Sequence, residues 1–421
     1  MWLAIAMALV IVHLPTSAWA SHPTSRQFND GSVPLSVAAL LIGLFCVLSA
    51  AIFWRVRSGR FHEGEVYLKT THFLPFAVQL VILSYWSMYW RDLPGYLPQI
   101  AVQIAFAYAV DATVAMVKDG RYRLTAGPLP IVGSINLFIQ FPASDWPMQY
   151  GAIALAILAK WLLTVRGRHV INPSALGIAV IGLLNLAWPS LGNGDVAHVF
   201  DLPPNMTEVL LLVALVVQTR VPVVLVSAGC VAGLWLHSMA SPQLNFSPLW
   251  SPVTLVALLL ATDPATSPRT GGGRLLFGLV FGLLVGLTGQ ALTALGFQDF
   301  YAKILPLPLC NALVPLFDRS YERLVTRGGP LESLLSPARN RLHVAVFLVA
   351  MSAALFVRGK PAAFSGISHR YNATRFVHWN GDARADCSRN PLFCEAFTFR
   401  SEALCWVASL QPTGQRCGSG Q

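Results

Sequence analysis

Long apolar runs separated by short polar segments make up most of the chain. After the first twenty residues we identify twelve such runs, and a helix needs about 20 apolar residues to cross a bilayer, or fewer where it is broken inside protein. The runs occupy residues 34–54, 73–90, 97–117, 126–142, 148–165, 171–189, 206–219, 221–238, 249–262, 274–295, 304–318 and 341–357. The pattern predicts an all-α polytopic membrane protein with about twelve transmembrane helices.

The composition strengthens this prediction and argues against a nucleic-acid partner. The 421 residues are 55% hydrophobic and 11% charged, whereas soluble domains carry about 25% charged residues. The formal net charge is +10, but Lys and Arg form short clusters between the apolar runs and make no basic stripe interleaved with exposed aromatics. The partner that the composition implies is the lipid bilayer.

The N-terminus predicts a signal peptide over residues 1–20. A short apolar core leads to Ala18-Trp19-Ala20, an A-x-A cleavage pattern before Ser21. The segment lacks a positively charged start, so an uncleaved anchor is the alternative. If Ser21 lies outside the cytoplasm, nearly all basic loop residues fall in the cytoplasmic loops, and the opposite loops hold only Arg91 and Lys303. This orientation predicts a multi-pass protein of the inner membrane, with the N-terminus and the C-terminal tail extracytoplasmic.

The cysteines divide between the apolar runs and the tail. Three lie in apolar runs and are expected to be small buried residues, namely Cys46, Cys230 and Cys310. Four lie in the polar tail, residues 358–421, namely Cys387, Cys394, Cys405 and Cys417. On an oxidising side these four predict two disulfides of unassigned connectivity. A zinc site is the alternative, but no CxxC pair supports it, and we predict no metal.

Several runs contain Pro and Gly near their ends, as in "TAGPLPIVGS", "INPSALG" and "LPLPLCNALVP". Broken helices of this kind are tolerated only inside protein or against a cavity, and they mark sites in inverted-repeat membrane folds. The ten runs within residues 72–325 divide into two halves of five, which have opposite orientations because five is odd. "NPSALGI" and "CNALVPL" match loosely at corresponding positions, although chance similarity is an alternative.

Two charged residues lie within apolar runs. Asp111 is surrounded by "FAYAVDATVAMVK" and Lys160 by "ALAILAKWLLTV". Each costs about 2.5–3.5 kcal/mol at the bilayer centre by insertion scales. We predict an ion or proton site at these residues. The alternatives are a salt-bridge partner for Asp111 and a side chain that reaches the interface for Lys160.

The stretch "LLLATDPATSPRTGGGRLLFGLVFGLLVGL…LCNALVPLFDRSYER" resembles the end of the RnfD/NqrB family, the membrane subunits of Rnf and sodium-pumping NADH:quinone oxidoreductase complexes. The residues that carry this resemblance are Thr262, Asp263, Pro264, Gly273, Arg274, Gly278, Asn311, Val314, Pro315, Leu316 and Asp318. An earlier stretch, "AKWLLTVRGRHVINPSALGIAV", is similar to the family's Lys…FNPA segment through Lys160, Asn172, Pro173 and Ala175.

The resemblance implies a ten-helix membrane domain over residues 72–325. It is preceded by a first transmembrane helix and cytoplasmic loop over residues 21–71, and followed by a linker and last helix over residues 326–357. The additional segments, and a family "DGSA…TG" turn kept only in part as "DGRYRLTAG", make the chain a divergent member. It looks like the RnfD-like proteins encoded beside enediyne-biosynthesis-type genes.

The resemblance also implies a flavin. In the family one FMN is bound covalently to the Thr of an SGAT motif, but the matching loop here, "SLGNGDVAHVFDLPPNM", contains no Thr. Covalent FMN is therefore predicted to be absent, and a non-covalent FMN or riboflavin is possible. The candidate cofactor-binding residues are Asp263, Pro264, Thr266, Arg269, Gly273, Arg274, Asn172 and Asn311. The simpler interpretation is that Asp263-Pro264 ends a helix and that Asn172 caps one.

Two functions follow from these patterns. The first is an integral membrane subunit of an electron-transport system of the Rnf/Nqr type, which would need redox partner subunits because the chain has no NAD-binding fingerprint, iron–sulfur spacing or haem motif. At most the chain would be a redox subunit of an oxidoreductase complex. The alternative is an inverted-repeat transporter or channel for a small solute or ion, based on the broken helices and Asp111.

Overall fold

The computed structural model describes residues 65–67, 70–87, 93–121, 123–139, 146–165, 167–187, 206–241, 251–295, 297, 299–325 and 329–358. The predicted signal peptide, the first apolar run, most of the loop at residues 190–206 and the four tail cysteines lie outside these residues. The predicted disulfides and the covalent-flavin loop therefore stay predictions.

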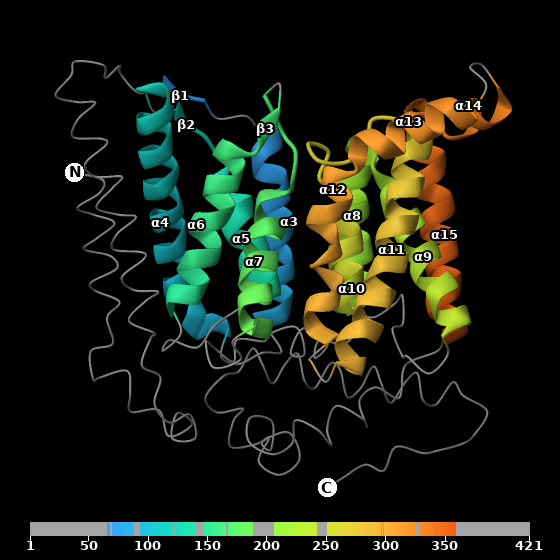
Figure 1. Ribbon diagram of the computed structural model, residues 1–421, viewed down its shortest axis with the longest axis horizontal. Helices are drawn as coiled ribbons and strands as arrows, with labels where there is room; N and C mark the ends of the chain where they lie inside the picture. Colours follow the sequence, from blue (N-terminus) through green and yellow to red (C-terminus); the bar gives the residue numbers. More distant parts are fainter. Residues whose placement is uncertain are drawn as a thin grey trace, which may run out of the picture.

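Helices occupy the predicted apolar runs from the second onward (Figure 1). Their bounds are α3 Thr70–Ser87, α4 Leu93–Asp119, α5 Pro128–Phe138, α6 Trp146–Leu162, α7 Pro173–Ala187, α8 Met206–Arg220, α9 Val224–Ala240, α10 Ser251–Leu255 with the π-helix η5 Val256–Leu260, α11 Gly271–Ala294, α12 Pro306–Ala312 with α13 Val314–Leu324, and α15 Asn340–Arg358. The short elements are the strands β1 Glu65–Val66, β2 Arg123–Leu124, β3 Thr164–Val165 and β4 Arg168–His169, the 3₁₀ helices η6 Asp299–Lys303 and η7 Pro337–Arg339, and α14 Pro330–Leu334. The helical prediction is confirmed.

Two of the described helices, Tyr96–Asp119 within α4 and Gly271–Ala294 in α11, are long and apolar enough to cross a bilayer. Other apolar helices are shorter, since Pro or Gly interrupts the runs. Large apolar side chains nevertheless face outward on several helices, as at Leu212, Leu287 and Val349. The protein is thus mainly helical with an apolar exterior, while the number of membrane crossings stays a prediction.

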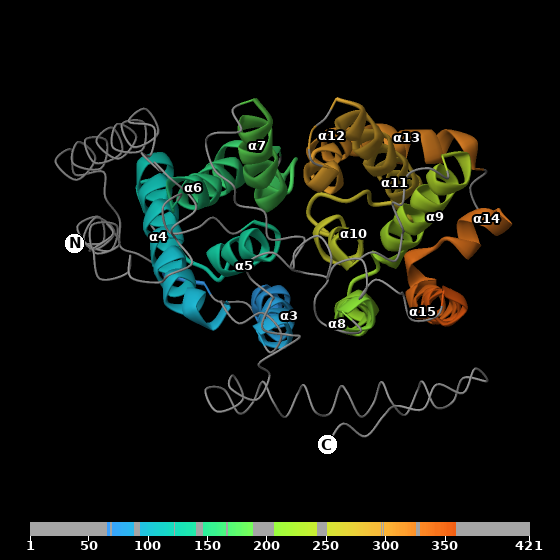
Figure 2. The same cartoon turned by 90° about the horizontal axis from the view of Figure 1, so that it is seen from below.

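The helices form two groups that stand side by side, α3 to α7 and α8 to α15 (Figure 2). Within the first group α3 packs on α5 and α6 packs on α7; within the second α8 packs on α10 and α9 packs on α11. The groups meet where α3 contacts α8 and where α7 contacts α12. We call the end of the bundle that carries the strands, α13 and α14 the upper end, as it lies in Figure 1.

A glutamine in the first helix of each group makes the same kind of bond. Gln79 in α3 donates from Nε2 to the Pro130 carbonyl of α5 at 3.0 Å, and Gln218 in α8 donates from Nε2 to the Leu258 carbonyl of η5 at 2.8 Å. The first helix of each group thereby binds the third. In both residues the amide oxygen Oε1 is buried and has no hydrogen-bond partner within the described part of the chain.

The contact of α9 with α11 is the most extensive between the described helices and depends on glycine. Gly229 and Gly233 of α9 lie against the backbone of α11, and Gly278 and Gly282 of α11 lie against the backbone of α9. Spacing by four places each pair on one helical face, so small residues let the two backbones approach closely. A methyl group at Gly278 would collide with the Val226 carbonyl oxygen.

We therefore expect Gly278→Val to destabilise the protein by about 1–3 kcal/mol, the usual cost of overpacking, because a backbone rather than a flexible side chain would have to move. The measurement is the melting temperature of the protein purified in detergent. Leu287→Val is the matched control, since Leu287 lies outward in the same helix. Equal melting temperatures for the two variants would contradict the packing described.

Candidate functional site

The turn between η5 and α11 is organised by the carboxylate of Asp263. Its Oδ1 accepts from the Ala265 amide at 3.0 Å and its Oδ2 accepts from Thr266 Oγ1 at 3.1 Å. The Asp263 carbonyl also accepts from the amides of Thr266 and Ser267. These bonds fold the chain back after the helix, as expected for Asp in a turn. Pro264 is exposed at its tip.

Asn172, at the start of α7 in the other group of helices, reaches this turn. Its Nδ2 lies 3.3 Å from both Asp263 Oδ2 and the Leu260 carbonyl oxygen. Its own Oδ1 accepts from the Ala175 amide at 3.1 Å and caps α7. One side chain therefore begins a helix and links the two groups.

Asn311 of α12 completes the network. Its Oδ1 accepts from the Asn172 amide at 3.1 Å, and its Nδ2 donates to the Thr266 carbonyl at 3.2 Å. Asn172, Thr266 and Asn311 are all buried. The structure thus brings together four of the predicted cofactor residues, Asp263, Thr266, Asn172 and Asn311, into one buried polar cluster, which we call the junction cluster.

The charge of Asp263 is not balanced by a salt bridge to a Lys or Arg among the described residues. A carboxylate after the C-terminal end of a helix is disfavoured by the helix dipole, whereas the N-terminal end of a helix favours it. The α7 N-terminus supplies such an end through Asn172, which binds the carboxylate. The junction cluster therefore stabilises a negative charge chiefly with dipoles.

A second carboxylate, Asp318 of α13, holds the other end of the turn. It accepts from the amides of Arg269 and Thr270 at 3.0 and 2.9 Å and from Thr270 Oγ1 at 2.6 Å. Thr270 Oγ1 in turn accepts from the Gly273 amide at 3.1 Å and caps α11. The sequence indicated Asp318 only as one residue of the family pattern and predicted no role for it.

The three glycines that begin α11 pack against the protein's own chain. Gly271 lies against the Leu335 carbonyl, Gly272 against the Tyr321 ring, and Gly273 against Asp318 and the Thr270 hydroxyl. A Cβ at any of them would overlap these atoms. Their small size therefore admits α13 and the segment after α14 to the start of α11.

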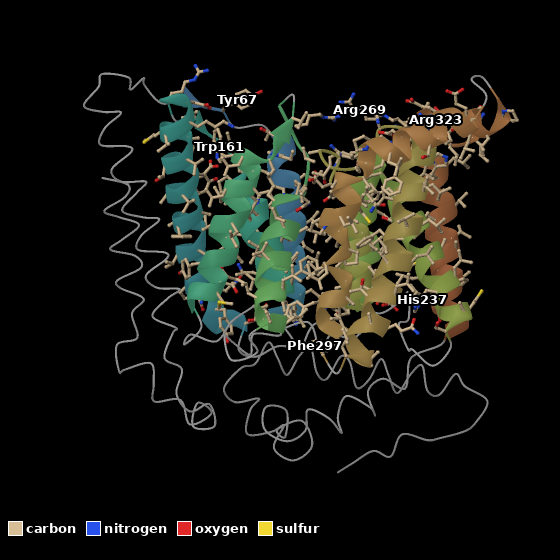
Figure 3. The ribbon with its side chains drawn as sticks, in the orientation of Figure 1. Tyr67, Trp161, His237, Arg269, Phe297 and Arg323 are labelled. Carbon is tan, nitrogen blue, oxygen red and sulfur yellow. The ribbon has the colours of Figure 1, made fainter. Side chains whose placement is uncertain are left out.

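The two predicted arginines of this turn differ in their surroundings. The Arg274 guanidinium donates to the Pro268 carbonyl at 2.9 Å and also to the Pro222 carbonyl, which ties the turn to the α8–α9 connection. Arg269 is exposed at the upper end (Figure 3). Of the two, only Arg269 presents its charge to the outside of the bundle.

Asp111 and Lys160 form an ion pair inside the first group of helices. Lys160 Nζ lies 2.8 Å from Asp111 Oδ1, and the Trp161 indole N–H donates to the same oxygen at 2.7 Å. The Asp111 side chain is 1% exposed and that of Lys160 is 17% exposed. Lys160 therefore turns inward to its partner, and the two charges that the sequence showed within apolar runs neutralise each other.

His169 lies between these two clusters and was missed by sequence reasoning. It ends the β3–β4 hairpin, three residues before Asn172. Burial lowers the pKa of His169, and the positive charge of Lys160 lowers it further. The negative charge of Asp263 and a hydrogen bond to the Lys160 backbone oppose this shift in part. Its Nδ1 is buried and has no hydrogen-bond partner among the residues that the structure describes. The signal in the sequence was a histidine directly before the "INPSALG" segment.

Comparison with known proteins places a central segment of the chain in a family context. Residues 190–326 match the model of the NQR2, RnfD, RnfE family. A Yersinia enterocolitica protein, named as a subunit of an ion-translocating oxidoreductase complex, is 33% identical over 147 residues, 34% of this chain and 37% of the relative. A Klebsiella pneumoniae protein of the same name is 39% identical over 108 residues, 24% of this chain and 29% of the relative.

The alignments thus span 37% and 29% of the two relatives' lengths. The family-matched segment contains the Asp263 turn, Asn311 and Asp318. The resemblance to the RnfD/NqrB family that the sequence predicts is confirmed.

Removal of one member of the Asp111–Lys160 pair should be costly. We expect Lys160→Met to lower stability by up to about 3 kcal/mol, because it leaves a buried carboxylate without its counter-charge. The double variant Asp111→Asn with Lys160→Met should recover part of this loss. Melting temperatures in detergent provide the measurement, and Arg121→Met, at an exposed arginine just after α4, is the matched control. A single variant as stable as the wild type would refute the pairing.

The lowered pKa of His169 predicts a pH dependence. The folded protein favours the neutral His169 ring. The resulting contribution to the free energy of unfolding is complete above the ordinary pKa of 6.5. It is lost as the pH falls below 6.5, toward the lower pKa of His169 in the folded protein. Wild-type protein should therefore lose melting temperature from about pH 7 to pH 5 more steeply than His169→Gln. Parallel pH profiles would contradict this expectation.

Proposed function

We propose that the chain is an integral membrane subunit of an ion-translocating electron-transport complex of the Rnf/Nqr type. The relatives from Yersinia and Klebsiella are named as subunits of an ion-translocating oxidoreductase complex. The segment that matches the family supplies Asp263, Thr266 and Asn311, three of the four residues of the junction cluster. The partners would be further redox subunits, and the location would be the inner membrane.

The observation that carries this proposal is the junction cluster itself. Asn172 and Asn311 come from motifs 139 residues apart, yet they bind each other and the Asp263 turn inside the protein. If the junction served only for packing, apolar residues would be sufficient. A buried polar network stabilises a protein only when each of its polar groups has a hydrogen-bond partner. Broken helix ends that meet inside a membrane protein are typical of binding sites.

The proposed topology has about twelve crossings, with α3 to α7 and α8 to α13 as inverted five-helix halves. The equivalent bonds of Gln79 and Gln218 support this symmetry. Arg269 and Arg323 both lie at the upper end, and His237 and Phe297 lie at the lower end (Figure 3). With basic residues on the cytoplasmic side, the upper end and the junction cluster face the cytoplasm.

We further propose that the junction cluster holds a non-covalent flavin. The fit rests on two buried polar atoms that have no partner among the described residues. They are Ser267 Oγ in the turn and Nδ1 of His169, a residue whose pKa the Asp263 charge raises. These atoms suit the polar edge of an isoalloxazine ring. The start of α11 suits a phosphate less well, because the protein's own chain fills the space at the glycines and Arg274 is bound to carbonyls. Riboflavin therefore fits the cluster better than FMN.

When bound, a flavin would supply the electron-carrying chemistry, and the chain would supply its position. Asp263 would accept a hydrogen bond or stabilise a nearby positive charge, and Asn172 would orient Asp263. Asn311 would hold the Thr266 carbonyl and so fix the shape of the turn. The protein's part in the reaction would thus be binding and orientation in a site of low dielectric.

The test is the flavin content of protein purified from flavin-replete cells, measured by the visible absorption band of flavin and by extraction. We expect wild-type protein to carry flavin, and Asp263→Asn and Asn172→Ala to lose at least about tenfold in affinity, as loss of a buried charged hydrogen bond predicts. Asp119→Asn, an exposed carboxylate at the same end, is the matched control. Colourless wild-type protein that takes up no flavin on titration would overturn the proposal.

A transporter or channel for a small solute or ion is the second candidate, favoured by the buried Asp111–Lys160 pair. Ionisable groups inside membrane domains commonly lie on ion pathways. Ion flux through liposomes that contain the protein without any redox partner, abolished by Asp111→Asn, would favour this function. Flux that requires an electron donor would favour the first.

A further inference from the structure

The element formed by α13, α14 and η7 lies across the upper end of the bundle and joins the last family helix to α15 (Figure 1). We call it the elbow. Phe317 anchors it, since this ring is buried and packs edge-on against Phe277 of α11 at 5.8 Å between centroids. Seen along the bundle, α14 lies beyond α9 at the outer edge (Figure 2). In the proposed membrane orientation the elbow therefore extends over lipid.

The elbow carries leucines that the described part of the protein leaves uncovered. Leu324 is 82% exposed, and Leu331 and Leu334 are each 49% exposed. Leu342 and Val346 are also exposed near the start of α15, and the Leu334 carbonyl oxygen lies 2.7 Å from His343 Nε2 of this helix. Exposed apolar side chains on a membrane helix and on the surface helix beside it are expected where the surface helix lies in the headgroup region with its leucines in the acyl boundary.

Exposed arginines accompany these leucines, two in α13 and two at the junction with α15, namely Arg319, Arg323, Arg339 and Arg341. Asp318, a neighbouring carboxylate, is occupied with the Arg269 and Thr270 amides. Glu322 and Glu332 also lie in the elbow, and the four arginines outnumber them. Arginine guanidinium groups bind phosphate oxygens through two parallel hydrogen bonds. Leucines in the acyl boundary and arginines at the level of the phosphates match the two layers of a phospholipid headgroup region.

We propose that the elbow is a binding site for anionic phospholipid of the cytoplasmic leaflet. The inference rests on the membrane orientation of the proposed function but not on its redox role. A protein partner is the less favoured occupant, because the exposed leucines of the elbow lie beside the start of α15, whose exposed apolar side chains would face acyl chains. Basic residues near a membrane surface each contribute about 1 kcal/mol of attraction to acidic lipid, which corresponds to about fivefold in affinity.

The experiment is native mass spectrometry of the full chain after incubation with equal amounts of phosphatidylglycerol and phosphatidylcholine. Wild-type protein should retain phosphatidylglycerol in preference. The variant with Arg319, Arg323, Arg339 and Arg341 all changed to Gln should lose this preference at least about tenfold. The variant with the same four arginines changed to Lys should keep most of it, which separates a role for charge from a failure to fold.

Arg121→Gln with Arg168→Gln is the matched control, because both arginines are exposed at the same end of the other helix group. It should keep the wild-type preference. The proposal is overturned if the Gln variant binds phosphatidylglycerol as the wild type does, or if the control loses as much. Flavin content is a separate readout, so a colourless protein that retains phosphatidylglycerol through the elbow would remove the redox proposal and leave this one standing.

Discussion

The arrangement of the protein depends on the hydrogen bonds that Asn172 makes across the junction of the two helix groups. Its side chain caps α7, binds the Asp263 carboxylate and the Leu260 carbonyl, and its amide binds Asn311. Polar groups in a buried site must find partners inside the protein. Two helix ends and one turn from distant parts of the chain are therefore held together, and this fixes how the two groups meet.

Two buried carboxylates are stabilised in different ways. Asp111 has a direct counter-charge in Lys160 and a hydrogen bond from Trp161, so its negative charge is neutralised where it lies. Asp263 has amides, a hydroxyl and the end of α7, but no lysine or arginine paired with it among the residues that the structure describes. Dipoles leave a net negative charge in place. Of the two, the Asp263 site is therefore better suited to a ligand or to a cation that comes and goes.

The sequence predicted the helices well, because apolar runs occur where a helix is buried in protein or exposed to lipid. The link between Asp263, Asn172 and Asn311 came from the family resemblance, since no periodicity relates residues so far apart. Three features were not predictable. The Asp318 bonds, the glycine contacts with Leu335 and Tyr321, and the place of His169 all arise from tertiary packing of segments that look like ordinary loops. The signal peptide and the tail disulfides stay predictions.

The packing of "TGGGR" indicates a role for this segment that differs from the one that its composition suggests. Consecutive glycines before a helix are a common way to bring a backbone close to a ligand. Here the atoms that come close belong to α13 and to Leu335 after α14, and Asp318 of α13 also binds the turn that begins at Asp263. The elbow and the junction cluster are thus joined through the hydrogen bonds and packing contacts of this turn. A change in how the elbow packs on the bundle would move the Thr270 end of the turn. Asn311 lies one helix turn before α13 and binds the Asn172 amide, so it is a second connection between the elbow and the junction cluster.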